Sequence, residues 1–145
     1  MPAQHKDPVP MTGPGSLTFA AWRPDPHRRY VCLAELLVRL GSFGLDLVWK
    51  VDLPDGPPGR SRPDEWAAAR EGIGSLRLLS LVTPEVQFVD GNYDGYDADG
   101  RLVLELQEFD STSWDVRSAD PWVLDEVRRW FPDARPSPPG AWGDA

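Results

Sequence analysis

The chain has few of the residues that familiar enzymes use as nucleophiles, bases or metal ligands. Its 145 residues include one cysteine and two histidines. A lone cysteine excludes an internal disulfide, and the apolar neighbours of Cys32 indicate a buried structural thiol. His5 lies in a Pro-rich leader, and His27 stands beside Arg28 and Arg29, which favours a surface position. Zinc, Walker and dinucleotide-binding motifs are absent, so the corresponding hydrolase and dehydrogenase chemistries lack their usual residues.

Long apolar runs are also absent, and the mean hydropathy is −0.42, so the sequence predicts no membrane span. The first sixteen residues are polar and rich in proline and glycine, without the apolar core of a secretory signal. We therefore expect a cytoplasmic protein. Residues 1–15 are predicted to be a flexible leader, in which Met11 is an alternative start.

Basic residues are scarce in one part of the chain. The net charge is −8, and the stretch from Glu85 to Asp125 holds eleven acidic residues against Arg101 and Arg117. Such a block repels nucleic acids and anionic lipids and attracts a basic protein surface or a hard cation. We therefore expect no nucleic-acid or membrane partner. A purely solubilising acidic surface is an equally open interpretation.

What is present indicates one α+β domain at residues 16–132, followed by a flexible tail at 133–145. Period-two alternation predicts strands, three- to four-residue spacing predicts helices, and Asp-Pro pairs predict helix starts. The predicted strands are 17–22, 45–53, 86–89, 101–109 and 113–116, and 76–81 fits either strand or helix. The predicted helices run from Asp25–Pro26 to Gly41, over 64–70 with Ser61 as cap, and from Asp120–Pro121 to Pro132.

The order of these elements predicts a mostly antiparallel sheet of about five or six strands, with two or three helices packed on one face. Short turns join the later strands, which favours a meander. An Asp- and Gly-rich connection at residues 90–100 is expected between two of them.

That connection resembles the start of a calcium-binding loop. Asp90, Asn92 and Asp94 have the D-x-N-x-D-G spacing that aims alternate oxygens at one ion. The twelfth position of the loop is Arg101, where a bidentate Glu is required, so Asp97 or Asp99 would have to substitute. A calcium-binding β module is therefore one hypothesis. The other is a structural hairpin connection that ends at Gly100, with no cofactor.

Aromatic residues among the acids provide a different hypothesis. An aromatic ring surrounded by carboxylates suits a basic protein partner, because the ring fills a pocket and the acids steer its approach. The predicted partner-binding residues are Tyr93, Asp94, Tyr96, Asp97, Asp99, Asp110, Trp114 and Asp115. For Trp114, a cross-strand pair inside the protein is the competing interpretation.

A small carboxylate-dependent enzyme is the remaining alternative. Asp110 and Asp115 flank Trp114 and are an available acid–base pair. Acids on an Asp-rich surface are usually solvated, so this sequence favours a protein without catalytic residues.

The segment from Phe109 to Ser118, followed by a helix that ends at Trp130–Phe131, resembles the C-terminal part of small acidic bacterial immunity proteins of toxin systems. The resemblance covers about a sixth of the chain. It implies a stoichiometric inhibitor of a basic partner, such as a toxin. The leading hypothesis is therefore a non-enzymatic immunity or inhibitor protein whose acidic β face covers that partner. The sequence does not indicate the oligomeric state.

Overall fold

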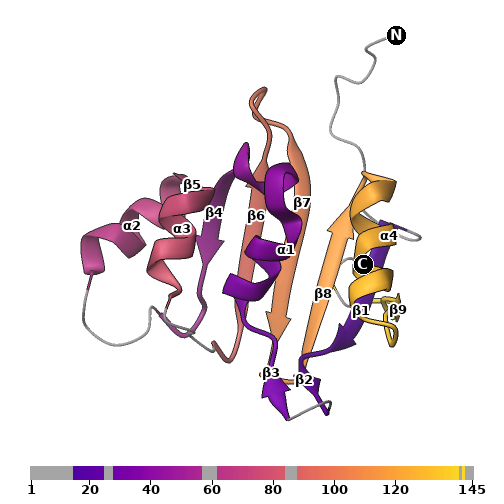
Figure 1. Cartoon of the computed structure of the whole chain (residues 1–145). Coiled ribbons are helices and arrows are strands. Elements are labelled where there is room, and N and C mark those ends of the chain that lie inside the picture. The colour runs from indigo at the N-terminus through magenta and orange to yellow at the C-terminus, as the bar shows by residue number, and fades with distance from the viewer. Residues whose placement is uncertain (1–14, 25–27, 57–61, 84–87, 141, 143–145) are drawn as a thin grey trace, which may run out of the picture.

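The computed structural model describes residues 15–24, 28–56, 62–83, 88–140 and 142. In these residues the chain forms four helices and a seven-stranded sheet, which confirms the predicted α+β class (Figure 1). The helices are α1 (Leu33–Leu45), α2 (Pro63–Glu71), α3 (Ser75–Leu81) and α4 (Pro121–Trp130). The large sheet contains β1 (Ser16–Ala20), β4 (Val48–Asp52), β5 (Ile73–Gly74), β6 (Gly91–Tyr96), β7 (Leu102–Phe109), β8 (Ser113–Ser118) and β9 (Arg135–Pro136).

The strand order is β5-β4-β6-β7-β8-β1-β9, and adjacent strands are antiparallel. The meander predicted for the later part of the chain is the β6–β7–β8 centre of this sheet. The two outermost strands are only two residues long. A separate two-stranded pair joins β2 (Trp22–Arg23) to β3 (Arg29–Tyr30).

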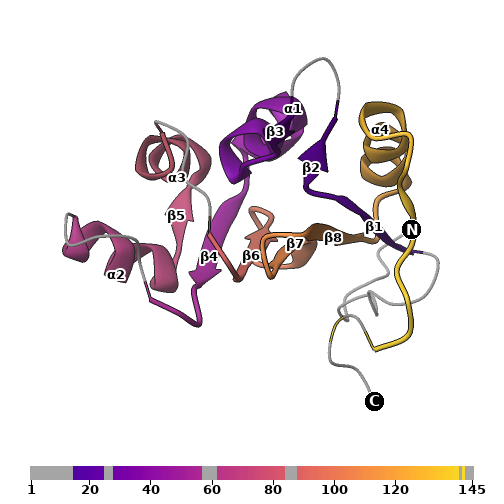
Figure 2. The same ribbon diagram turned by 90° about the horizontal axis from the view of Figure 1, so that it is seen from below.

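The helices leave one face of the sheet open. Figure 2 shows α1 and α4 above one face, with α2 and α3 at the β4–β5 end. The core lies between this face and the helices, and it contains the fully buried rings of Trp49, Tyr93 and Trp114. Phe19 of β1 stacks on Phe131 after α4 with ring centroids 4.0 Å apart. The described residues on the opposite face include the C-terminal segment, in which β9 pairs with β1 and the centre of the Trp142 ring lies 4.5 Å from the Arg117 guanidinium of β8 (Figure 2).

The first helix begins later than predicted. Its start was placed at Asp25–Pro26, which lies outside the described residues, but α1 begins at Leu33 and Arg29–Tyr30 form β3. The physical reason is tertiary: the Tyr30 hydroxyl donates a hydrogen bond to Glu108, and the Tyr30 ring packs edge-on against Trp22 at 5.1 Å. Gly41 interrupts the helical geometry with φ 55°, and the helix resumes beyond it.

The acidic connection at residues 90–100 is another correction. Residues 91–96 form β6, a central strand, and only the turn from Asp97 to Gly100 joins it to β7. Gly91 and Gly95 allow this because their lack of side chains makes room for Tyr93 and for Leu47 and Trp49. The strand predicted at 86–89 falls partly outside the described residues, and Phe88 and Val89 lie outside any strand.

The other helices agree more closely with prediction. The Asp120 side chain caps α4 by accepting a hydrogen bond from the Trp122 amide at 2.9 Å. The segment at 76–81 is helical, as α3. The helix predicted at 64–70 is α2, which is preceded by Arg62 with φ 61°, whereas the predicted cap Ser61 is outside the described residues.

Part of the segment assigned to a tail contributes to the sheet. Arg135–Pro136 form β9 beside β1, and the Ser137 amide donates to the Ser16 carbonyl at 3.1 Å. The Trp142 indole donates to the Ser16 hydroxyl at 2.7 Å. These contacts exist because β1 would otherwise present an unpaired edge, which an extended segment satisfies.

Candidate functional site

The open side of the sheet, called here the helix-free face, consists of three cross-strand rows over β4, β6, β7 and β8. The rows follow from the strand registers and run across the sheet. They are an apolar row of Val48, Tyr96 and Leu102, a charged row of Lys50, Asp94, Glu105 and Arg117, and a polar row of Asp52, Asn92, Gln107 and Asp115. Exposed Phe109 lies beyond the polar row.

The charged row places two carboxylates between two cations. Arg117 Nε lies 2.7 Å from a carboxylate oxygen of Glu105, and Lys50 Nζ lies 4.9 Å from the centre of the Tyr96 ring. Asp94 pairs across the strands with both Lys50 and Glu105. Burial and the neighbouring charge of Glu105 raise the pKa of Asp94 to about 6, although Arg117 and Lys50 oppose the shift. Asp94 therefore titrates close to neutral pH.

The predicted partner-binding residues are divided by the fold. Asp94, Tyr96 and Asp115 lie together on the helix-free face. Asp97 and Asp99 lie in the β6–β7 turn at one end of the sheet, where both bind the Arg101 guanidinium. Asp110 is in the β7–β8 turn at the opposite end, with φ 51° and its amide bonded to Asp90.

The other two predicted residues are not on the surface. Tyr93 and Trp114 are each 0% exposed, so neither can contact a partner directly. Their side chains lie on the helix-covered face because strand neighbours alternate, which places Asp94 and Asp115 on the opposite side. The Trp114 indole donates to the Val31 carbonyl at 2.8 Å, and its ring lies 5.9 Å from that of Tyr93. This is the cross-strand interpretation that the sequence left open.

Glu108 is a buried carboxylate next to Tyr93. From the sequence it was counted only as one of the acidic residues. Glu108 is 1% exposed and accepts hydrogen bonds from the hydroxyls of Tyr30 and Tyr93. Burial raises the pKa of Glu108 to about 7, while the two hydroxyls and a backbone hydrogen bond with Phe88 oppose the rise. Because the side chain is 1% exposed, its titration is expected to affect the stability of the fold.

The calcium loop is not formed as a loop. Asn92 and Asp94 lie in β6, where residues two apart are about 6.6 Å apart along the strand, so their oxygens do not converge. Asp90 instead accepts a hydrogen bond from the Asp110 amide at 2.8 Å. In the described part of the chain, no group of three or more His, Cys, Asp or Glu residues is arranged to hold a metal ion.

The carboxylate pair considered for catalysis is also separated. Asp115 borders a hollow beneath Arg135 and Pro138, and Asp110 does not line it. Asp115 is buried, which raises its pKa, and it accepts a hydrogen bond from the Ser137 hydroxyl at 3.2 Å. Asp110 is therefore not part of the pocket that Asp115 lines.

The sequence analysis did not assign Lys50, Asp52, Glu105, Phe109 and Arg117 to the site. The period-two alternation of residues in a strand could have shown which side chains share a face. Once residues 91–96 are taken as a strand, Asp94 and Tyr96 fall on one side and Tyr93 on the other. Which strands are neighbours was not visible, because β4 pairs with β6 across the intervening α2 and α3.

Three comparisons with known proteins give no further information: no protein-family model, curated protein or solved structure matches the chain. Among the described residues, no helix is long and apolar enough to cross a membrane.

Proposed function

We propose that this chain is a non-enzymatic binding protein whose helix-free face covers a basic protein partner. The observation that supports this most directly is the distribution of charge on that face. The exposed or half-buried acids of its rows are Asp52, Asp94 and Glu105, against the two cations Lys50 and Arg117, whereas Asp115 is buried next to Ser137 and Arg135. Arg117 is bound to Glu105 and Lys50 lies over Tyr96, which leaves a small negative excess, on Asp52 and Asp94, for a partner.

The chemistry of the face favours a protein over a small molecule. Phe109 is 52% exposed and Val48 43% exposed, and both lie beside charged residues. Apolar groups enclosed by polar ones are typical of protein interfaces, whereas small ligands prefer enclosed concave pockets. The acids at the two ends of the sheet, Asp97, Asp99 and Asp110, extend the negative potential and steer a basic partner.

The specific form that we propose is a bacterial immunity or inhibitor protein acting in the cytoplasm. It is supported by the resemblance of the segment from Phe109 to Ser118 and the helix that follows, and by the acidic composition. Such a protein needs no reaction of its own, because it inhibits by covering the partner. Many toxins of this type are basic nucleases, which would explain the sign of the charge.

The test begins with capture by the immobilised full chain from a lysate of the native host at low salt. The captured protein is then purified, and its binding kinetics are measured against wild type and Asp52→Lys/Asp99→Lys. Both replaced acids are exposed. Reversing them should slow association about tenfold and reduce its salt dependence.

The matched control is Asp64→Lys/Asp125→Lys, which reverses two exposed acids on α2 and α4 and should leave the rate within about twofold. The inhibitor form also requires that one equivalent of the chain abolish the activity of the captured protein. Equal slowing by both double variants, or a captured protein without a basic surface, would contradict the proposal.

A further inference from the structure

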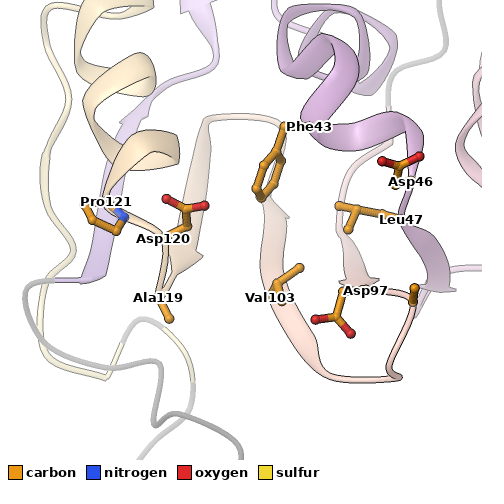
Figure 3. Close-up of a pocket in the computed structure, with 9 residues that line it drawn as sticks. Phe43, Asp46, Leu47, Asp97, Val103, Ala119, Asp120 and Pro121 are labelled. Atoms are coloured by element: carbon orange, nitrogen blue, oxygen red, sulfur yellow. The ribbon is translucent and has the colours of Figure 1, made fainter. Parts of the chain in front are cut away.

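A pocket of about 540 Å³ opens at one end of the sheet, where α1 ends, β6 turns into β7, and β8 leads into α4 (Figure 3). Its apolar part consists of Phe43, Leu47 and Val103, with Ala98, Ala119 and Pro121 around them. The pocket includes Asp97 and so adjoins the turn that bounds the helix-free face.

A register shift in the sheet contributes to the apolar part. Between Gly95 and Tyr96 the pairing of β6 with β7 slips, so that Tyr96 faces Leu102 and Gly95 faces Leu104. Strict alternation would place Val103 with Glu105 on the helix-free face, but Val103 instead packs against the core and lines the pocket. This is the usual effect of a bulge, which redirects one side chain.

An aromatic ring forms another wall. Figure 3 shows Phe43 between Asp120 on one side and Asp46 on the other, with Val103 and Asp97 beneath. The Phe43 ring is held by Trp122 of α4, with the centroids 5.5 Å apart. The ring therefore has a fixed position from which to contact an inserted group.

Three carboxylates border this apolar space, and they differ in the number of hydrogen bonds that they accept from the protein. Asp97 accepts hydrogen bonds from the Asp99 and Arg101 amides and from the Arg101 guanidinium. Desolvation by itself would raise the pKa of Asp97, but these hydrogen bonds outweigh that effect and lower the pKa. The Asp97 carboxylate therefore stays ionised. Asp120 uses Oδ1 to cap α4, and Oδ2 makes no hydrogen bond with the described residues. Asp46 has no side-chain partner among those residues.

The end of α1 adds to the negative potential. Asp46 is the C-cap of this helix, and its last turn holds no basic residue. A helix C-terminus carries a partial negative charge, so it favours a cation nearby. The pocket thus combines apolar walls, a fixed aromatic ring and two carboxylates that have few hydrogen-bond partners. This combination is complementary in shape and charge to a long side chain with a positively charged end.

We infer that this pocket receives an arginine side chain of the basic partner. The inference rests on the proposed function and specifies where that partner is anchored. The methylene groups of the arginine contact Leu47 and Val103, its planar guanidinium stacks on Phe43, and its N–H groups donate to Asp46 and Asp120. The chain uses the same chemistry internally, where Arg101 binds Asp97 and Asp99.

The size of the face gives an independent reason for an anchor outside it. Four neighbouring strands, about 4.8 Å apart and about 20 Å long, cover a flat area of only about 400 Å². A stable interface needs about 800 Å² on each side. The partner therefore has to extend past the sheet, and the pocket lies at the end of the sheet that holds the β6–β7 turn, between the end of α1 and the start of α4. Buried arginines are frequent anchors in such interfaces.

The first test needs no partner. The ¹⁵N-labelled full chain is titrated with N-acetyl-argininamide and, separately, with N-acetyl-citrullinamide, which has the same shape without the charge. We expect saturable shifts at the amides of Ala98, Val103 and Ala119, with Kd of about 1 mM, and at least tenfold weaker binding of the citrulline compound. Equal binding of the two compounds, or shifts confined to other regions, would overturn the inference.

Asp46→Asn/Asp120→Asn removes the two charges while asparagine preserves the cap of α4. Binding of the arginine compound should weaken at least tenfold, whereas Asp64→Asn, an exposed acid on α2, should leave it unchanged. An unchanged Kd in the double variant refutes the pocket. Unchanged chemical shifts away from residues 46 and 120 verify that the fold is intact.

The purified basic partner separates this inference from the proposed function. Asp46→Asn/Asp120→Asn should raise the dissociation rate at least tenfold. If the partner binds the double variant as tightly as wild type, the pocket assignment is wrong and the proposed function stands. If the captured protein is not basic but the arginine titration succeeds, the pocket binds arginine and the proposed function fails.

Discussion

The carboxylate of Glu108 accepts a hydrogen bond from the Tyr93 hydroxyl at 3.0 Å, and both side chains are buried on the helix-covered face of the sheet. Tyr30 donates to the other carboxylate oxygen. One ionisable group of β7 therefore connects β3 with β6 in the core.

Glu108 should make the protein less stable as the pH rises. Its pKa is about 7 in the folded protein, above the ordinary 4.5, so the folded state holds the proton more tightly. Its contribution is greatest below about pH 4.5 and is lost as the pH rises through 7. The free energy of unfolding should fall by up to about 3 kcal/mol over this interval.

Glu108→Gln should flatten this part of the profile, measured by urea denaturation between pH 4.5 and 8. Glutamine has the same shape and still accepts one tyrosine hydrogen bond. A slope identical to that of wild type would show that Glu108 does not titrate in this range.

Gly91→Ala should destabilise the protein by about 2–3 kcal/mol. A Cβ at this position would lie 2.2 Å from the Tyr93 hydroxyl oxygen, which its bond to Glu108 prevents from moving. Gly74→Ala is the control, because open space surrounds that position, and it should change stability by less than about 0.5 kcal/mol. Denaturation midpoints of the two variants that coincide would contradict the packing argument.

Asp94→Asn should stabilise the protein at pH 8 by about 1 kcal/mol, less than the full shift implies because the carboxyl is partly solvated. Burial and Glu105 raise the pKa of Asp94 to about 6, so its ionised form is disfavoured in the fold. The gain should disappear below about pH 4, where both states are protonated. A loss of stability at pH 8 would show that the charged row depends on the negative charge of Asp94.

Asp120→Ala should cost about 1 kcal/mol through loss of the α4 cap, whereas Asp120→Asn should be nearly neutral. Chemical denaturation at pH 7 distinguishes them. If both variants lose the same stability, the charge of Asp120, and not its hydrogen bond to Trp122, stabilises the helix.

The sequence correctly predicted the helices and strands whose local residue pattern agrees with their surroundings in the fold. The alternation of Leu47, Trp49 and Val51 identified β4, and Asp120–Pro121 identified the start of α4. The pattern failed at residues 29–30 and 91–96. There the conformation depends on contacts between residues distant in the sequence, Tyr30 with Glu108 and the strand β6 with β4. Asp and Gly usually indicate turns, and tertiary packing outweighed this preference.

The sequence predicted the acidic and aromatic composition of the candidate site. It did not predict which of these residues lie together on the surface. Residue order alone established an acidic, aromatic-containing α+β chain, because charge and periodicity are properties of consecutive residues. The fold determined which of those residues face solvent: it buried Tyr93, Trp114 and Glu108 and placed Lys50, Asp94, Glu105 and Arg117 in one row. Strand register and burial join residues distant in sequence, so they depend on the free energy of the whole core.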